Sequence, residues 1–185
     1  MYPAIGKRSE VGPEDLKIIA RQLGREPRGL LRVARRCPAG HPQVLQVYPL
    51  MENKAGLLEP FPTIFWLSCP RLVRQIAKLE HQGLICKLEA LIQADERLGA
   101  RYASDHLAYQ RERWSLLTEH DKLLVRRDPR WWAAFWERGI GGLGELGRVK
   151  CLHLHYAHHL ARCNVIGEWI AAHCSIEPCA GQVQG

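Results

Sequence analysis

Long apolar runs are missing from this chain. No stretch approaches the roughly 20 apolar residues that a membrane-spanning helix requires. The N-terminal MYPAIGKRSE lacks the apolar core of a signal peptide. Heptads, internal repeats and long Lys/Arg runs are also missing, which argues against a coiled coil, a solenoid and a basic nucleic-acid arm. We therefore expect a cytoplasmic protein that does not insert into membranes.

The composition is that of a globular chain with a basic bias. Its 185 residues suit one domain, and a hydrophobic fraction of 46% is enough for a buried core. We expect one globular domain over residues 1–175 and a flexible C-terminal tail over residues 176–185. The net charge of +7 predicts an anionic ligand, either a phosphate ester or nucleic acid. A basic surface with no specific partner explains the charge equally well, and nothing in the sequence indicates an oligomeric state.

The chain has seven cysteines although it shows no export signal. They occupy positions 37, 69, 86, 151, 163, 174 and 179. An odd number of cysteines in a reducing compartment argues against a disulfide framework. Metal ligation, reactivity or simple burial remain as explanations, and none of the spacings is of the CxxC type.

The hydrophobic pattern predicts an α+β fold. Strand-like segments separated by turn residues occupy residues 30–37, 43–50 and 61–70. Helical periodicity runs from Pro13 to Gly24, returns between Pro70 and Gly83, and continues through most of the chain to residue 173. We expect a predominantly helical domain with a small antiparallel sheet of about three strands.

The stretch GRVKCLHLHYAHHLARCN, residues 147–164, concentrates cysteine and histidine. A helix over residues 149–161 would place its large apolar side chains on one face. Cys151, His155 and His158 would then share the opposite face, away from the core, where thiolate and imidazole one turn apart can bind a metal ion. We expect His153 and His159 to form hydrogen bonds at the core boundary.

Two further cysteines are candidates to complete such a site. Cys37 and Cys69 each end a predicted strand, so both thiols can lie at one edge of the sheet. Together with Cys151 and either His155 or His158 they would form a Cys₃His site for zinc. Three cysteines with a labile fourth position would instead suit an iron–sulfur cluster.

Cys69 also allows a second interpretation. It stands at the N-cap of a predicted helix, with Pro70 in the first helical position and Arg71 and Arg74 nearby. The helix dipole and the arginines would favour a thiolate, which suits a nucleophile as well as a metal ligand. The Cys–Arg spacing is one residue short of the phosphatase signature.

A glycine-rich stretch, GIGGLGELG, precedes the histidine-rich segment. Gly141 and Gly142, with Arg148 and Lys150, could bind an anion at a helix N-terminus. The pattern is neither a P-loop nor GxGxxG in a strand–helix context. A flexible connector explains the glycines equally well.

Four segments together resemble a bacterial family of unknown function, domain-of-unknown-function family 501. They are RCPAGHP, FPTIFWLSCP, GIGG and RVKCLHLHYAHHLARCNVIGEW. The resemblance covers most of residues 15–173, and VKCLHxHYAHxLA is its most specific motif. It implies that Cys37, Cys69 and Cys151 belong to the family motifs, with His153 and His158, whereas Cys86 and Cys163 are incidental. The family pattern has Asn-Pro where this chain has Asn164-Val165.

Three functional hypotheses follow. The first is a metal- or iron–sulfur-binding protein whose Cys/His site lies beside an anion-binding loop and acts on a phosphorylated or nucleotide-like substrate. The second is a non-enzymatic module that binds nucleic acid or protein around a structural zinc ion. The third is a thiol-dependent enzyme that uses Cys69.

Overall fold

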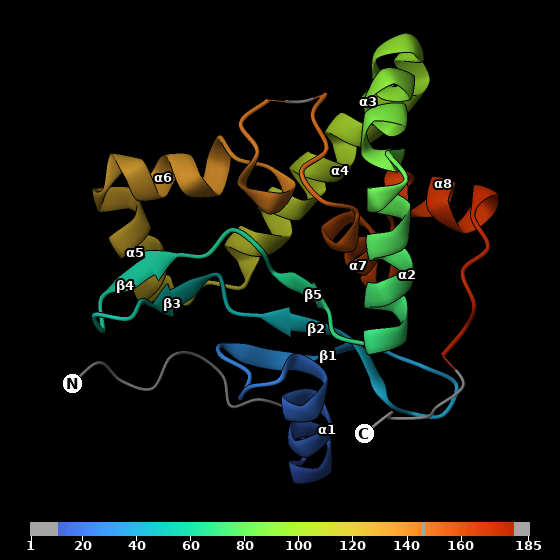
Figure 1. Cartoon of the computed structure of the whole chain (residues 1–185). Helices are drawn as coiled ribbons and strands as arrows, with labels where there is room; N and C mark the ends of the chain where they lie inside the picture. The colour runs from blue at the N-terminus through green and yellow to red at the C-terminus, as the bar shows by residue number, and fades with distance from the viewer. Residues whose placement is uncertain (1–10, 146, 180–185) are drawn as a thin grey trace.

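The computed structural model describes residues 11–145 and 147–179, which form eight α-helices and two small sheets (Figure 1). The helices are α1 Pro13–Leu23, α2 Pro70–His81, α3 Leu84–Ala94, α4 Glu96–Ser115, α5 Glu119–Arg127, α6 Pro129–Trp136, α7 Leu152–Ala161 and α8 Val165–His173, with a 3₁₀ turn, η1, at Ile140–Gly142. The strands are β1 Leu30–Arg36, β2 Pro42–Val47, β3 Leu50–Glu52, β4 Leu58–Pro60 and β5 Phe65–Leu67. The predicted α+β fold, mostly helical with a three-stranded antiparallel sheet, is confirmed.

The main sheet is antiparallel, with strand order β1-β2-β5. Val44 pairs with Leu67 and Leu45 pairs with Trp66, so β2 lies in the centre. Every residue of β2 is buried. Figure 1 shows why: α1 covers one face of the sheet and α7 lies over the other.

A second, two-stranded sheet was not predicted. The predicted strand over residues 43–50 is divided after Val47, and the chain then forms the β3–β4 hairpin. Pro49 lies at the break, and proline has no N–H to donate to a ladder. The predicted strand over residues 61–70 shortens to β5, with Pro62 and Pro70 on either side.

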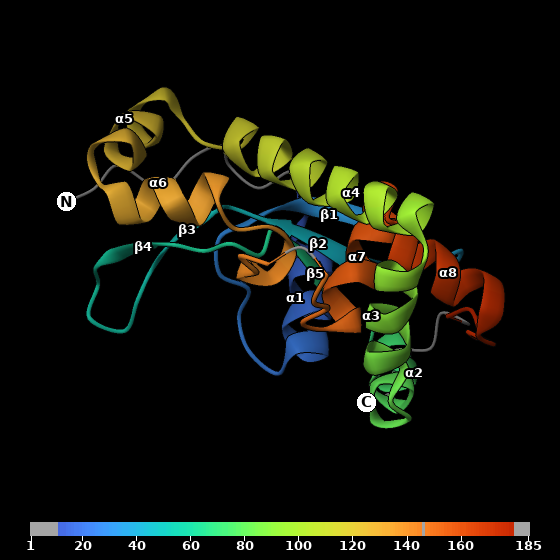
Figure 2. The ribbon, with the colours of Figure 1, turned by 90° about the horizontal axis from the view of Figure 1, so that it is seen from above.

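Local sequence signals set several helix ends. Pro70 is the first residue of α2, as predicted, and Cys69 is its N-cap. Gly83 has a φ of +80° and links α2 directly to α3, a conformation that glycine adopts without strain. The Asp95 side chain accepts hydrogen bonds from free N–H groups in the first turn of α4. Helix α4 runs across the molecule above α7 (Figure 2).

Helix α7 lies in the middle of the molecule and contacts β5, α2 and α8. The prediction that it presents a polar face away from the core is wrong. Only 1% of His155 and 2% of His158 is exposed, because the His155 ring packs against α4 and the His158 ring against β5. The helix also begins at Leu152 rather than near residue 149, since Cys151 is extended, with φ −164° and ψ 129°.

The ends of the chain bear on two further predictions. Glu177, in the predicted tail, forms hydrogen bonds with α2, whereas residues 180–185 lie outside the described residues. The N-terminal segment MYPAIGKRSE also lies outside them. In the described ranges, every helix is too short or too polar to cross a bilayer.

Candidate metal centre

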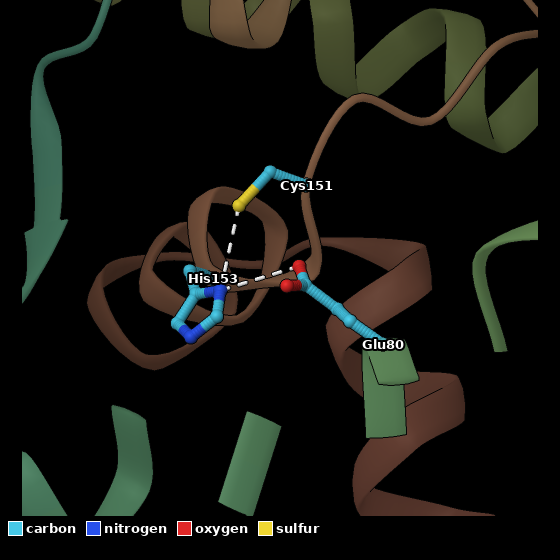
Figure 3. A group of neighbouring side chains, drawn as sticks. All are labelled: Glu80, Cys151 and His153. Carbon is cyan, nitrogen blue, oxygen red and sulfur yellow. Dashed lines mark hydrogen bonds and ion pairs between the residues drawn. The ribbon is translucent and has the colours of Figure 1, made fainter. Parts of the chain in front are cut away.

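Three side chains of different types meet where the end of α2 approaches the start of α7. Glu80 lies in the last turn of α2, Cys151 is the N-cap of α7, and His153 is in the first turn of α7 (Figure 3). One potential ligand atom from each lies within 4.8 Å of the other two. All three residues are partly buried, so they are shielded from water without being sealed off.

His153 lies at the centre of this group. Its Nδ1 is 3.4 Å from the Cys151 sulfur and 3.2 Å from Oε1 of Glu80. Its Nε2 lies 3.1 Å from the carbonyl oxygen of Val73. A carbonyl oxygen only accepts, so Nε2 carries a proton and Nδ1 is the ring nitrogen that faces Cys151 and Glu80. Metal-binding histidines are commonly fixed through the second ring nitrogen in this way.

Glu80 is held by the backbone of α7. The N–H of Leu152 donates a hydrogen bond of 2.6 Å to Oε1 of Glu80. The first N–H groups of a helix have no partner within the helix and favour a negative charge. Glu80 therefore stabilises the start of α7, and α7 fixes the position of the carboxylate.

The surroundings of His153 raise its pKa to about 9. The main cause is the hydrogen bond with Cys151, while the charges of Cys151 and Glu80 and the carbonyl of Val73 act in the same direction. Partial burial opposes the shift. In the absence of a metal ion the Nδ1 proton therefore lies between sulfur and carboxylate, and these two groups favour a positive charge there.

The comparison with known proteins identifies the family. A family model described as "Protein of unknown function (DUF501)" matches residues 33–172. The chain belongs to the DUF501 family. The matched region includes Glu80, Cys151 and His153. No curated protein and no solved structure matches the chain.

Cys37 and Cys69 of this DUF501 chain lie at the same end of the sheet, but on opposite sides of β2. Both are buried, at 5% and 2% exposed. Cys37 follows β1 and Cys69 follows β5, and these two strands are roughly 10 Å apart because β2 lies between them. Neither cysteine belongs to the metal-ligating group found among the described residues, and Cys69 packs in the core with Leu72 and Val149.

His155 and His158 occupy the interior instead of this group. The ring of His155 lies against Tyr102 and His106, and His158 stacks on Phe65 with ring centroids 5.7 Å apart. Burial lowers the pKa of His155 to about 3 and that of His158 to about 4. Both are therefore neutral, and they pack as polar aromatic rings.

His106 is a buried histidine that the sequence interpretation missed. Its Nδ1 accepts a hydrogen bond of 3.2 Å from the N–H of Ile140. Nε2 of His106 and both ring nitrogens of His155 are buried without a hydrogen-bond partner among the described residues. Burial, followed by the charge of Arg113, lowers the pKa of His106 to about 4.

The glycine-rich stretch and the cations beside it make contacts within the protein. Nζ of Lys150 donates to the carbonyl of Gly141 at 2.8 Å, and Nε of Arg148 lies 3.2 Å from Oε1 of Glu89. Gly142 has a φ of +78° and packs near Pro62. Internal packing and contacts thus involve all four predicted anion-binding residues, Gly141, Gly142, Arg148 and Lys150. The N-terminus of α7, which follows them, already has the Glu80 carboxylate as its anion.

Glu80 is the member of the group that sequence reasoning did not find. It lies 73 residues from His153, and its position in the last turn of a predicted helix carries no sign of a ligand. His153 was indicated by the family motif but not by the helical wheel. Only the tertiary contact between α2 and α7 brings these side chains together.

Proposed function

We propose that this DUF501 chain binds one divalent transition-metal ion, preferably Zn²⁺, through Cys151, His153 and Glu80. The convergence of one sulfur, one nitrogen and one oxygen ligand within 4.8 Å carries this proposal. The hydrogen bond from Nε2 of His153 to Val73 supports it, because it leaves Nδ1 available as a ligand. Zinc accepts thiolate, imidazole and carboxylate in this combination.

An iron–sulfur cluster is less well supported. Such clusters are usually held by several cysteine thiolates. The converging group contains one cysteine, and Cys37 and Cys69 are separated from each other by β2. We therefore favour a mononuclear site.

Three protein ligands would leave a fourth position for water or substrate. This number is typical of catalytic zinc, whereas structural zinc normally has four protein ligands. A metal ion bound here would act as a Lewis acid or activate a water molecule, and the basic chain would favour an anionic, phosphorylated substrate. All seven cysteines are free, which supports a cytoplasmic location.

Metal analysis of the full-length chain tests the proposal. We expect one zinc ion per chain, with one sulfur neighbour at about 2.3 Å in X-ray absorption spectra. Cys151→Ser should weaken zinc binding by more than about 100-fold, since even partners of the ligands contribute about 10- to 100-fold. Cys86→Ser is the matched control, because Cys86 is exposed on α3. Iron with several sulfur neighbours, or equal zinc loss in both variants, would contradict the proposal.

A thiol-based activity is the second candidate, and the 3.4 Å contact between Cys151 and His153 favours Cys151 for it. Cys69 is 2% exposed, which leaves a substrate little access to its sulfur. A neighbouring imidazolium generally favours the reactive thiolate. Metal-free protein should then react with iodoacetamide at Cys151 faster than at Cys86, and zinc should protect Cys151. Equal rates at the two cysteines would exclude this activity.

A further inference from the structure

Strand β1 is an edge strand of the main sheet. Its neighbour on one side is β2, and no strand lies on its other side in the part of the chain that the structure describes (Figure 1). Apart from its ladder with β2, β1 forms no backbone hydrogen bond among the described residues. An edge strand of this kind turns a row of N–H and C=O groups outward. The outer edge of β1 can therefore pair with one more extended chain.

The segment that forms this edge is strongly basic. Residues 28–36, RGLLRVARR, contain four arginines and no acidic residue. Two of the arginines donate to neutral oxygens: Arg28 to the backbone carbonyl of Glu52, and Nε of Arg32 to the side-chain amide oxygen of Gln46 at 2.7 Å. These contacts position both guanidinium groups and leave their charges without a carboxylate among the described residues.

The other two arginines of the segment differ from each other. Arg36 is paired with the Asp15 carboxylate at 2.5 Å and is therefore neutralised. The exposed guanidinium of Arg35 has no hydrogen bond, ion pair or ring contact with any other described residue. Three of the four charges, those of Arg28, Arg32 and Arg35, thus form an uncompensated surplus along β1.

The apolar side chains of β1 are only partly covered. Leu30, Leu31, Val33 and Ala34 are half-buried, whereas every residue of the neighbouring strand β2 is buried. Side chains that face each other across two paired strands lie close enough to pack together. An added strand with apolar side chains would therefore cover this remaining apolar surface.

The charge of the edge discriminates between two possible occupants. A second copy of the chain, paired through its own β1, would bring arginines opposite arginines, and like charges opposite each other destabilise a strand pair. Charged edge strands protect proteins from such self-pairing. An acidic extended segment would instead place carboxylates near Arg32 and Arg35, so charge complementarity favours it.

We propose that the outer edge of β1 binds an acidic, extended segment of a partner protein as an additional strand. Backbone hydrogen bonds to β1 supply affinity, and pairing of the partner's carboxylates with Arg28, Arg32 and Arg35 supplies specificity. The proposal is independent of the metal centre, because it needs neither Cys151 nor His153.

Calorimetric titration of the full-length chain with a capped peptide of alternating glutamate and valine, as long as β1, tests the charge. Arg35→Glu should weaken binding about tenfold, because a repulsion of similar size replaces one attraction across the strands. Arg97→Glu reverses an exposed charge at the start of α4 and should change affinity less than about twofold, because distant surface charges are screened. Neither guanidinium has a partner among the described residues, so both variants should fold.

Two further measurements test the strand pairing itself. A peptide in which proline replaces each valine keeps the charge but loses N–H donors, so it should bind at least about tenfold more weakly. With the valine peptide at about ten times its dissociation constant, hydrogen exchange of outward amides in β1 should slow about tenfold.

The same measurements can overturn the proposal. It fails if the valine peptide does not bind, if Arg35→Glu and Arg97→Glu lose equal affinity, or if the proline peptide binds equally well. Peptide binding without slower exchange in β1 would also contradict it. Tighter binding of a short thymidine oligonucleotide of equal charge would indicate a nucleic-acid surface instead. Protection of β1 that increases with protein concentration, without peptide, would assign the edge to a second copy.

Discussion

The N–H of Leu152 donates its hydrogen bond to the same oxygen of Glu80 that lies 3.2 Å from Nδ1 of His153. One carboxylate oxygen from the end of α2 therefore caps α7 and faces the imidazole. Cys151 completes the arrangement from the N-cap position, where its extended backbone places it just before the helix. The stability of the α2–α7 contact and the proposed metal affinity thus depend on the same atom.

Replacing Glu80 should separate these two roles. In Glu80→Ala the N–H of Leu152 loses its acceptor, and we expect unfolding free energy to fall by about 1–2 kcal/mol, the size of a lost helix cap. Glu80→Gln keeps an oxygen acceptor and should lose less stability. Both variants remove the carboxylate and should weaken zinc binding. Urea denaturation and competition with a zinc chelator measure the two effects.

Glu89 provides a matched control for Glu80. Its Oε1 accepts a hydrogen bond of 2.8 Å from the N–H of Val149 and pairs with Arg148, but it lies outside the metal-ligating group. Glu89→Gln should therefore lower stability slightly and leave zinc affinity unchanged. If it weakened zinc binding as much as Glu80→Gln does, Glu80 would not be a ligand.

The raised pKa of His153 predicts an alkaline loss of stability in metal-free protein. Its ordinary value of 6.5 rises to about 9 in the folded chain, so folding favours the protonated ring. This contribution is complete below pH 6.5 and disappears as the pH rises through about 9. His153→Gln should flatten the stability curve between these limits in urea titrations. An unchanged slope in the variant would show that His153 does not carry the effect.

Local signals in the sequence were sufficient for much of the fold. Pro70 and Gly83 bound α2 because proline suits the first helical position and glycine accepts a positive φ. The prediction of an exposed polar face on α7 was wrong because a helical wheel describes one helix and not its neighbours. Histidine can lie at the surface as a polar group or in the core as a neutral ring. The residue type of His155 and His158 therefore did not indicate that they are buried.

The candidate site was predictable only in part. Cys151 and His153 lie in one recognisable motif, and a metal site there is an inference from residue type. Glu80 reaches the motif through the packing of α2 on α7, which no spacing in the sequence encodes. Cys37 and Cys69 follow β1 and β5, and the roughly 10 Å between these strands depends on the strand order, which places β2 between them.

The buried histidines predict a loss of stability in acid. Burial lowers the pKa of His106 from 6.5 to about 4, so the folded chain favours the neutral ring. Stability should fall as the pH drops from about 6.5 to about 4, because the unfolded chain takes up the proton first. His106→Gln keeps an acceptor for the Ile140 N–H and should reduce this slope. The exposed His120→Gln is the control, and equal slopes in the two variants would contradict the assignment.

Substitutions of two glycines can test whether the glycine-rich stretch before α7 is packed or is a flexible connector. A Cβ added to Gly139 would lie 1.8 Å from Nδ1 of His106, whereas a Cβ at Gly144 would meet nothing within 4 Å. Neither glycine has a positive φ, so the backbone tolerates alanine at both positions. Gly139→Ala must displace His106 from the Ile140 N–H and should cost about 1–3 kcal/mol or more through overpacking. Gly144→Ala should be neutral or stabilise by about 0.4–1 kcal/mol, because alanine restricts the unfolded chain. Thermal denaturation of the pair decides the matter, since a flexible connector would tolerate both substitutions equally.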